Sequence, residues 1–196
     1  MVNAKIKQLE KAIKNIHYNP PKTGINADPK RREFLKNFWD YHVMTVAEAS
    51  QKMAVKYGGD KDIIYIGAIM HDIGLVYSKQ KHDLVGAVKA YNLLVKKGFG
   101  KKMARAASNI ALCHRCKEEF PKTVEEKIVA SADAIAHFSP AYYLGLAVIA
   151  NEDYKDLAKN NLKKLIKDYN NKIFFEAEKK KFKKVVKAFK KIFREK

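Results

Sequence analysis

Residues 63–74, IIYIGAIMHDIG, constrain the fold of this chain more than any other segment. An apolar run ends there in the adjacent His71 and Asp72, and the helix breaker Gly74 follows two residues later. A buried imidazole beside a buried carboxylate is costly unless the two are paired or hold a metal ion. Neighbouring residues of a helix point about 100° apart, so one ion can contact both only at a helix end. The segment therefore predicts a helix terminus whose remaining partners come from other helices.

Length and composition favour a single globular domain. The chain has 196 residues, of which 47% are hydrophobic and 31% charged, enough for a sizeable core. No apolar run is long enough to span a bilayer, and the opening MVNAKIKQLEKAI lacks the apolar core of a signal peptide. We therefore expect a cytoplasmic protein with no membrane partner. Cys113 and Cys116 are too few for a disulfide framework and suit a reducing compartment.

Apolar residues recur at helical spacing along the chain and predict an all-α fold. Residues 2–17 form a first helix, with His17 as a surface residue in its last turn, and residues 18–29 form a loop rich in Asn, Pro and Gly. One helix follows to about residue 57, and others are expected at about 60–72, 82–97, 101–114, 123–138 and 140–150. In the helix that starts at residue 82, the expected buried positions are Val85, Val88, Tyr91, Leu94 and Val95.

Several of these helices carry a polar residue on or at the end of their apolar face. His42 lies in the middle of one core-facing stripe, His114 ends another, Asp133 lies on an alanine-rich face, and His82 begins a helix. A single histidine in such a position is more often a core residue satisfied by a hydrogen bond than a ligand. With the doublet at 71–72 there are five such positions, and the explanation as an ordinary core residue would have to apply to each of them. All of these residues are types that first-row metals accept.

The order of these residues resembles the HD-domain superfamily of metal-dependent phosphohydrolases. The family has a histidine, a His-Asp doublet and a distant aspartate, matched here by His42, the string HDIG at 71–74 and Asp133. The segments GAIMHDIG, HDLVGAVKA and TVEEKIVASADAI look like the family's surrounding helices, so the resemblance covers roughly residues 34–138. It implies an all-helical HD-domain bundle with a metal held where the helices converge.

The resemblance also bears on the number of ions and on the substrate. His82 and His114 match the additional histidines of the family's two-metal members, which implies a binuclear site; in a mononuclear site they would face the substrate phosphate. Leu75 stands where many relatives carry a lysine after HDIG. The GYP signature of cyclic dinucleotide phosphodiesterases is missing around residues 116–122. Both departures argue against a cyclic dinucleotide substrate.

Mixed imidazole and carboxylate ligands suit one or two divalent transition-metal ions: Fe, Mn, Ni, Co or Zn. Water bound to such an ion has its pKa lowered from about 15.7 towards about 7 and supplies hydroxide at neutral pH. In the binuclear interpretation the catalytic residues are Asp72, His82 and His114. The predicted ligands are His42, His71 and Asp133 for one ion, His82 and His114 for the other, and Asp72 as a bridge between them.

Two nearby motifs are left outside this ligand set. Cys113 and Cys116 flank His114 in CHRC, but no second CxxC exists, so we interpret them as small buried residues rather than zinc ligands. His137 lies one helical turn after Asp133. It is either an outer partner of the site or an ordinary histidine at the edge of the core.

The formal net charge of +19 indicates attraction to anions. Lys79, Lys81 and Arg115 are the predicted phosphate-binding residues, with Lys117 as a further candidate, on their sequence positions alone. Residues 151–196 carry 16 basic and 7 acidic residues, an excess of 9. Lysine without interleaved arginine and aromatic residues gives little specific recognition, so nucleic acid is a possible partner but not the favoured one.

The sequence therefore predicts three segments: an N-terminal helix and loop at 1–28, an HD metal-binding domain at 29–150, and a basic, lysine-rich helical extension at 151–196 that packs on the domain. The predicted function is metal-dependent hydrolysis of a small phosphorylated substrate, a nucleotide or a dinucleoside polyphosphate. Two alternatives stay open: an HD-type di-iron oxygenase, and a nucleic-acid or anionic-surface binding module with a regulatory HD site. The oligomeric state is open as well.

Overall fold

The computed structural model describes residues 4–149 and 153–192. Within these residues it contains ten α-helices and no strand, which confirms the predicted all-α fold. The α-helices are α1 (Ala4–Tyr18), α2 (Pro29–Phe38), α3 (Met44–Tyr57), α4 (Lys61–Met70), α5 (His82–Lys96), α6 (Lys101–Cys113), α7 (Val124–Ala136), α8 (Pro140–Ile149), α9 (Tyr154–Asn171) and α10 (Glu176–Ile192). Three short elements join them: the 3₁₀ turns η1 (Gly24–Asn26) and η3 (Ile73–Val76), and the π-helical turn η2 (Trp39–Val43).

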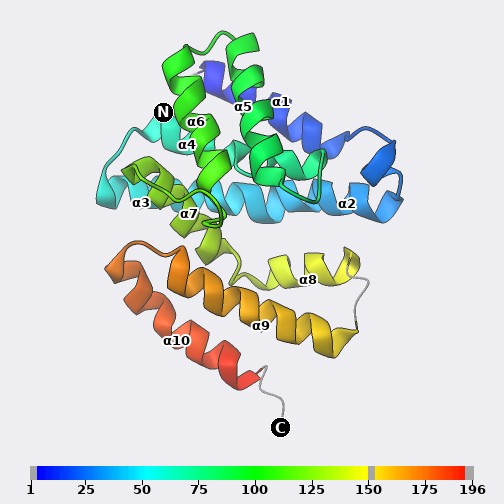
Figure 1. The fold of residues 1–196 in the computed structure, drawn as a ribbon, viewed down its shortest axis with the longest axis vertical. Helices are drawn as coiled ribbons and strands as arrows, with labels where there is room; N and C mark the ends of the chain where they lie inside the picture. Colours follow the sequence, from blue (N-terminus) through cyan, green and yellow to red (C-terminus); the bar gives the residue numbers. More distant parts are fainter. Residues whose placement is uncertain (1–3, 150–152, 193–196) are drawn as a thin grey trace.

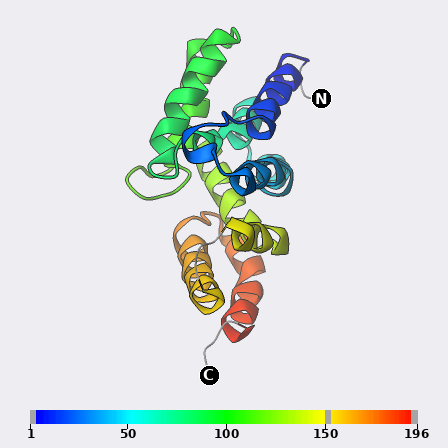
Figure 2. The same cartoon turned by 90° about the vertical axis from the view of Figure 1, so that its right-hand side faces the viewer.

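The helices are arranged in an upper bundle and a lower layer. Figure 1 shows α1 to α7 gathered above α8, α9 and α10, with α10 at the bottom. The pair α5 and α6 packs side by side and projects from the top of the molecule, as the turned view also shows (Figure 2). Helix α7 contacts α3, α4 and α6 in the bundle and α9 in the lower layer, so it connects the two parts.

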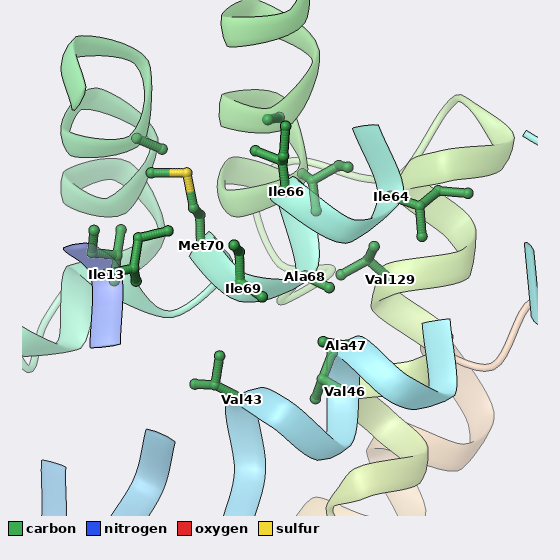
Figure 3. Packing of buried hydrophobic residues seen from close by; sticks show 14 of the residues in the cluster. Ile13, Val43, Val46, Ala47, Ile64, Ile66, Ala68, Ile69, Met70 and Val129 are labelled. Atoms are coloured by element: carbon green, nitrogen blue, oxygen red, sulfur yellow. The ribbon is translucent and has the colours of Figure 1, made fainter. Parts of the chain in front are cut away.

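The apolar helix α4 lies at the centre of the core. Its residues Ile64, Ile66 and Ile69 are fully buried. Figure 3 shows side chains of α4 facing Val46 of α3, with Val129 of α7 beside them. A helix that is apolar on all sides must be covered on all sides. Because α4 is buried, the two residues that follow it, His71 and Asp72, also lie inside the protein.

Local capping signals set several helix starts as the sequence predicts. The Asp28 side chain caps α2 ahead of its first proline, and the Asp60 side chain accepts hydrogen bonds at the start of α4. Thr123 and Glu126 form a reciprocal capping box at the start of α7. These caps explain why α4 and α7, which carry His71 and Asp133 respectively, begin where they do.

The predicted helix up to residue 57 contains an interruption. The backbone stays helical from Pro29 to Tyr57, but residues 39–43 form a π-helical turn between α2 and α3. A π-turn adds one residue to a helical turn, shifts the faces that follow, and often lies at functional sites. Here the turn carries His42, which is buried as predicted.

The prediction that His17 is a surface residue is wrong. Its side chain is fully buried, and its ring lies 5.5 Å, centroid to centroid, from the ring of Trp39. Helix α1 packs on α2 and on the π-turn, which covers its last turn. Periodicity alone could not show this covering, because it depends on how two helices distant in sequence pack together.

The predicted buried face of α5 is also partly wrong. Leu94 is buried as expected, but Val88 and Val95 are 59% and 39% exposed, and Gly86 and Ala90 are buried instead. Small residues face η3 because the two backbones approach closely: a Cβ added to Gly74 would lie 1.9 Å from the carbonyl oxygen of His82. Periodicity predicts that the large apolar side chains are buried, whereas the packing buries two small residues, Gly86 and Ala90.

The C-terminal helices form their own small apolar cluster. It contains Phe138, Leu165 of α9 and Val186 of α10. The predicted boundary at residues 150–151 lies outside the described residues, and the division into three segments stays a prediction. Over the part of the chain that the structure describes, no helix combines the length and hydropathy needed to cross a membrane.

Candidate metal centre

The structure brings all six predicted ligands to one buried site at the junction of five helices. One comes from the π-turn, two from the end of α4, and one each from the start of α5, the end of α6 and the last turn of α7. The site contains three overlapping groups of three residues, and within each group the donor atoms lie within 4.8 Å of one another. The groups are His42 with His71 and Asp72, Asp72 with His82 and His114, and His42 with Asp133 and His137. Helix ends supply most of these residues, as the HDIG segment predicts.

Asp72 lies at the centre of the site, and each of its two carboxylate oxygens lies near two imidazole rings. Its Oδ2 lies 3.1 Å from Nε2 of His71 and 3.6 Å from Nε2 of His42. Its Oδ1 lies 3.2 Å from Nε2 of His82 and 3.2 Å from Nε2 of His114. This is the arrangement in which one carboxylate can contact two ions at once.

Asp133 provides the second carboxylate. Its Oδ1 lies 3.2 Å from Nε2 of His42 and 3.8 Å from Nε2 of His71, on the side of the site that Oδ2 of Asp72 also faces. The same oxygen lies 3.1 Å from Nε2 of His137, one turn further along the chain. His137 is therefore adjacent to the predicted ligands, with a ring nitrogen directed at one of them.

Backbone carbonyls fix the tautomers of two histidines. Nδ1 of His71 donates a hydrogen bond to the oxygen of Ala68, and Nδ1 of His114 donates one to the oxygen of Ala111, each at 2.7 Å. A carbonyl oxygen can only accept, so Nδ1 carries the proton and the neutral ring keeps a lone pair on Nε2. Both lone pairs face Asp72, the orientation that a metal ligand requires.

The donor set fits divalent metal ions. Oδ1 of Asp72 and Oδ1 of Asp133 are buried and make no hydrogen bond of ordinary geometry to any described residue. Nε2 of His42 and Nε2 of His71 face each other at 3.3 Å, where a cation or a proton must separate two lone pairs. Buried, unsatisfied carboxylate oxygens beside imidazole nitrogens are costly unless a cation joins them.

Both carboxylates are held in their ionised form. Burial by itself raises the pKa of Asp72, but the imidazoles of His71 and His114 outweigh burial and hold the pKa well below its usual range. Burial likewise opposes ionisation of Asp133, and the charges of His137 and Lys172 hold its pKa well below the usual range. The ionised form is the one that binds metal.

Sequence reasoning missed a contribution from the C-terminal extension. Lys172, the residue that ends α9, is buried, and its Nζ donates a hydrogen bond to Oδ2 of Asp133. Asp168, one turn earlier, accepts a hydrogen bond from Nδ1 of His137 at 2.8 Å and one from Nζ of Lys164 at 2.6 Å. The available signal was that Asp168 and Lys172, four residues apart, flank the apolar stripe of α9.

A cavity of about 500 Å³ opens onto this centre. Of the predicted phosphate-binding residues, Lys79 and Arg115 line it, as does the further candidate Lys117. Lys81 does not line it; this exposed residue caps the start of α5 with a left-handed backbone conformation. Helix α9 contributes Lys164, Lys167 and Asp168 to the wall, and its C-cap contributes Lys172.

The two cysteines lie apart from the ligand groups. Cys113 and Cys116 are buried free thiols, and burial raises their pKa values to about 12 and about 11. Among the residues that the structure describes, no candidate ligand group contains a cysteine. Their surroundings agree with the interpretation of small buried side chains.

Comparison with known protein families gives one result. The family model described as HD domain matches residues 39–137, which is half of the chain and includes all six predicted ligands. Comparison with curated proteins gives no significant match, and neither does comparison with solved structures. HD domains bind divalent metals, in agreement with the donor set described above. The chain therefore belongs to the HD domain family, whose members form a superfamily of metal-dependent hydrolases.

Proposed function

We propose that the protein is a metal-dependent phosphohydrolase that acts on a nucleotide, a dinucleoside polyphosphate or another small phosphorylated compound. One observation carries the proposal: Asp72, whose two oxygens each lie near two imidazoles, lines a cavity that is rich in basic side chains. The cavity is lined by seven basic residues, Arg31, Lys79, Arg115, Lys117, Lys164, Lys167 and Lys172, against the three carboxylates of Asp72, Asp133 and Asp168. Such an excess of positive charge favours an anionic substrate over a neutral one.

The chain's own residues have separate roles in this proposal. Divalent ions held here would acidify a bound water and offset charge on a phosphoryl oxygen. Asp72 would position both ions, because its two oxygens face different pairs of histidines. His82 and His114, with Nε2 atoms 3.2 Å from Oδ1 of Asp72, would hold the second ion.

The cations of the cavity would bind the phosphate. Nη1 of Arg115 lies 3.2 Å from Oδ1 of Asp83, which holds the guanidinium while leaving other N–H groups free to donate. Lys79 lines the same cavity from the connector between η3 and α5. Fixed donors of this kind stabilise negative charge that develops on a transferred phosphoryl group.

An adjacent apolar cavity supports a substrate that also carries an apolar group. It has a volume of about 400 Å³ and lies between α2 and α8. It shares Phe34, Phe38 and Tyr142 with the basic cavity, so the two cavities are neighbours. Aromatic walls suit a planar ring such as a nucleobase.

The proposal is tested by measuring phosphate release. Metal-stripped protein is supplied separately with Mn, Co, Ni and Fe(II) and assayed against nucleotides and dinucleoside polyphosphates. We expect metal-dependent release from one substrate class, lost in Asp72→Ala while the far-UV circular dichroism stays helical. Metal binding with no release from any substrate, or oxygen consumption with Fe(II) alone, would contradict the proposal.

A further inference from the structure

Besides Lys79, the basic cavity contains two lysines that form no ion pair with any described residue. Lys117, in the connector between α6 and α7, and Lys167, on α9, both line the cavity. Within residues 4–149 and 153–192, neither makes a hydrogen bond through its ammonium group or an ion pair. The other cations of this wall differ: Arg115 pairs with Asp83, and Lys164 pairs with Asp168.

These cations repel one another. The pKa of Lys117 is lowered, chiefly by the neighbouring charge of Arg115, then by burial and by the charge of Lys167. Charges that lower a neighbour's pKa lie close enough to interact through the cavity. A cluster of this kind costs free energy in the empty protein, and a bound anion removes that cost.

The cluster belongs to the same cavity as the metal centre but uses different residues. Asp72, His82 and His114 line this cavity as well, so an anion bound to the lysines would lie in the same space as a group bound at the metal centre. Lys167 and Lys164 lie outside residues 39–137, the part that matches the HD domain. The C-terminal extension therefore adds charge to a site whose other residues belong to the family domain.

We propose that Lys117, Lys164 and Lys167 form a second anion subsite next to Arg115, which binds a further phosphate group of a substrate with two or more linked phosphates. One phosphate would lie at the metal centre, and the next would lie between α9 and the connector that precedes α7. The substrate interpretation rests on the proposed function; the subsite itself does not need turnover. Ammonium and guanidinium groups in one wall suit a polyphosphate chain, whose charges follow one another closely.

A compact polyphosphate fits the observations better than nucleic acid does. The unpaired lysines lie in the wall of a cavity of about 500 Å³, shared with buried residues of the metal centre. The basic residues of α10 do not line this cavity. Nucleic-acid binding would instead draw on the exposed lysines of α9 and α10 together and depend on total charge.

The test is calorimetric binding of inorganic tripolyphosphate and of orthophosphate to the full-length protein, both metal-stripped and Mn-loaded. The double variant Lys117→Ala/Lys167→Ala removes the two unpaired charges. The control is Lys159→Ala/Lys183→Ala, which removes the same net charge from exposed positions on α9 and α10 that do not line the cavity. Circular dichroism verifies that both double variants are folded.

We expect the wild type to bind tripolyphosphate at least tenfold more tightly than orthophosphate. The cavity variant should lose about tenfold in tripolyphosphate affinity, and the control should stay within about twofold of the wild type. Equal losses in both variants would show an effect of total charge and overturn the subsite, as would no loss in either. A larger loss of affinity for a single-stranded oligonucleotide than for tripolyphosphate in the cavity variant would overturn it in favour of nucleic acid.

The two proposals fail in different ways. Selective tripolyphosphate binding without metal-dependent phosphate release from any substrate would refute the proposed function and leave the subsite. Metal-dependent release that Asp72→Ala abolishes, with tripolyphosphate binding unchanged in Lys117→Ala/Lys167→Ala, would refute the subsite and leave the proposed function.

Discussion

Lys172 at the end of α9 donates a hydrogen bond from its buried Nζ to Oδ2 of Asp133 on α7. A residue of the C-terminal extension thereby contacts a predicted metal ligand 39 positions earlier in the chain. Both side chains are almost completely removed from solvent, 4% and 2% exposed respectively, so water cannot replace either partner. The extension is thus part of the electrostatic structure of the metal centre.

Replacing Lys172 by methionine should strongly destabilise the metal-free protein. The carboxylates of Asp133 and Asp168 would stay buried without this positive charge, and breaking a buried pair costs about 3–5 kcal/mol. Urea unfolding of metal-stripped Lys172→Met measures the loss, with Lys159→Met, exposed on the same helix, as the control. Added Mn²⁺ should restore part of the stability, because a divalent ion also neutralises Asp133. A loss below about 1 kcal/mol would show that the pair has no such role.

Substitution of single histidines should remove one ion at a time. His42 faces Oδ2 of Asp72, whereas His82 faces Oδ1. We expect two ions per chain in the wild type, one in His42→Ala, one in His82→Ala and none in Asp72→Ala. Elemental analysis after metal loading and dialysis gives these ratios. A single ion in the wild type, unchanged by His82→Ala, would contradict a bridging carboxylate.

Gly74→Ala should disturb both stability and metal binding. The new Cβ would lie 1.9 Å from the carbonyl oxygen of His82 and 2.7 Å from the nitrogen of Gly86, and neither backbone can yield without moving α5. We expect a loss of about 1–3 kcal/mol or more in urea unfolding, together with weaker metal binding as His82 moves away.

The matched control is Gly100→Ala. An added Cβ there meets nothing within 4 Å, and its φ of −60° suits any residue. Gly100 is the N-cap of α6, where alanine is less favourable than glycine, so we expect a loss of about 1 kcal/mol or less, well below that of Gly74→Ala. Equal effects of the two substitutions would show that the close approach of Gly74 to α5 is unimportant.

His17 should make the stability fall in acid. Burial lowers its pKa to about 4 in the folded protein, from 6.5 when unfolded. Below pH 6.5 the unfolded state binds the proton first, so stability is complete above that pH and declines as the pH falls towards 4. At about 1.4 kcal/mol per pKa unit, the contribution is roughly 3 kcal/mol. Urea unfolding of the metal-stripped protein from pH 7 to pH 4.5 should show a shallower decline in His17→Leu, and equal declines would refute this role.

Much of the metal centre could be predicted from the sequence, because the necessary information is local. The helical spacing of apolar residues predicted the all-α fold, and the caps at Asp60 and Thr123 predicted the starts of two helices that lead to ligands. His42, His114 and Asp133 could be predicted as ligands because each is a residue type that binds metals and lies on an apolar helix face. All of these features depend on spacing within one helix.

The remaining features depend on the way separate helices pack. His17 is buried because α1 lies across Trp39, and α5 turns small residues inward because Gly74 brings η3 against it. Periodicity within a helix cannot reveal which neighbour covers it, or at what distance. Both errors therefore arose from contacts between segments distant in the chain.

The sequence by itself determined the helices, the order of the ligands and their chemistry. The tertiary structure alone decided that Asp72 divides the histidines between its two oxygens and that Lys172 and Asp168 reach the site from α9. From the sequence alone, Lys172 looks like one more solvated lysine of a lysine-rich segment. It becomes a buried counter-ion only when the packing of α9 on α7 removes water from around it.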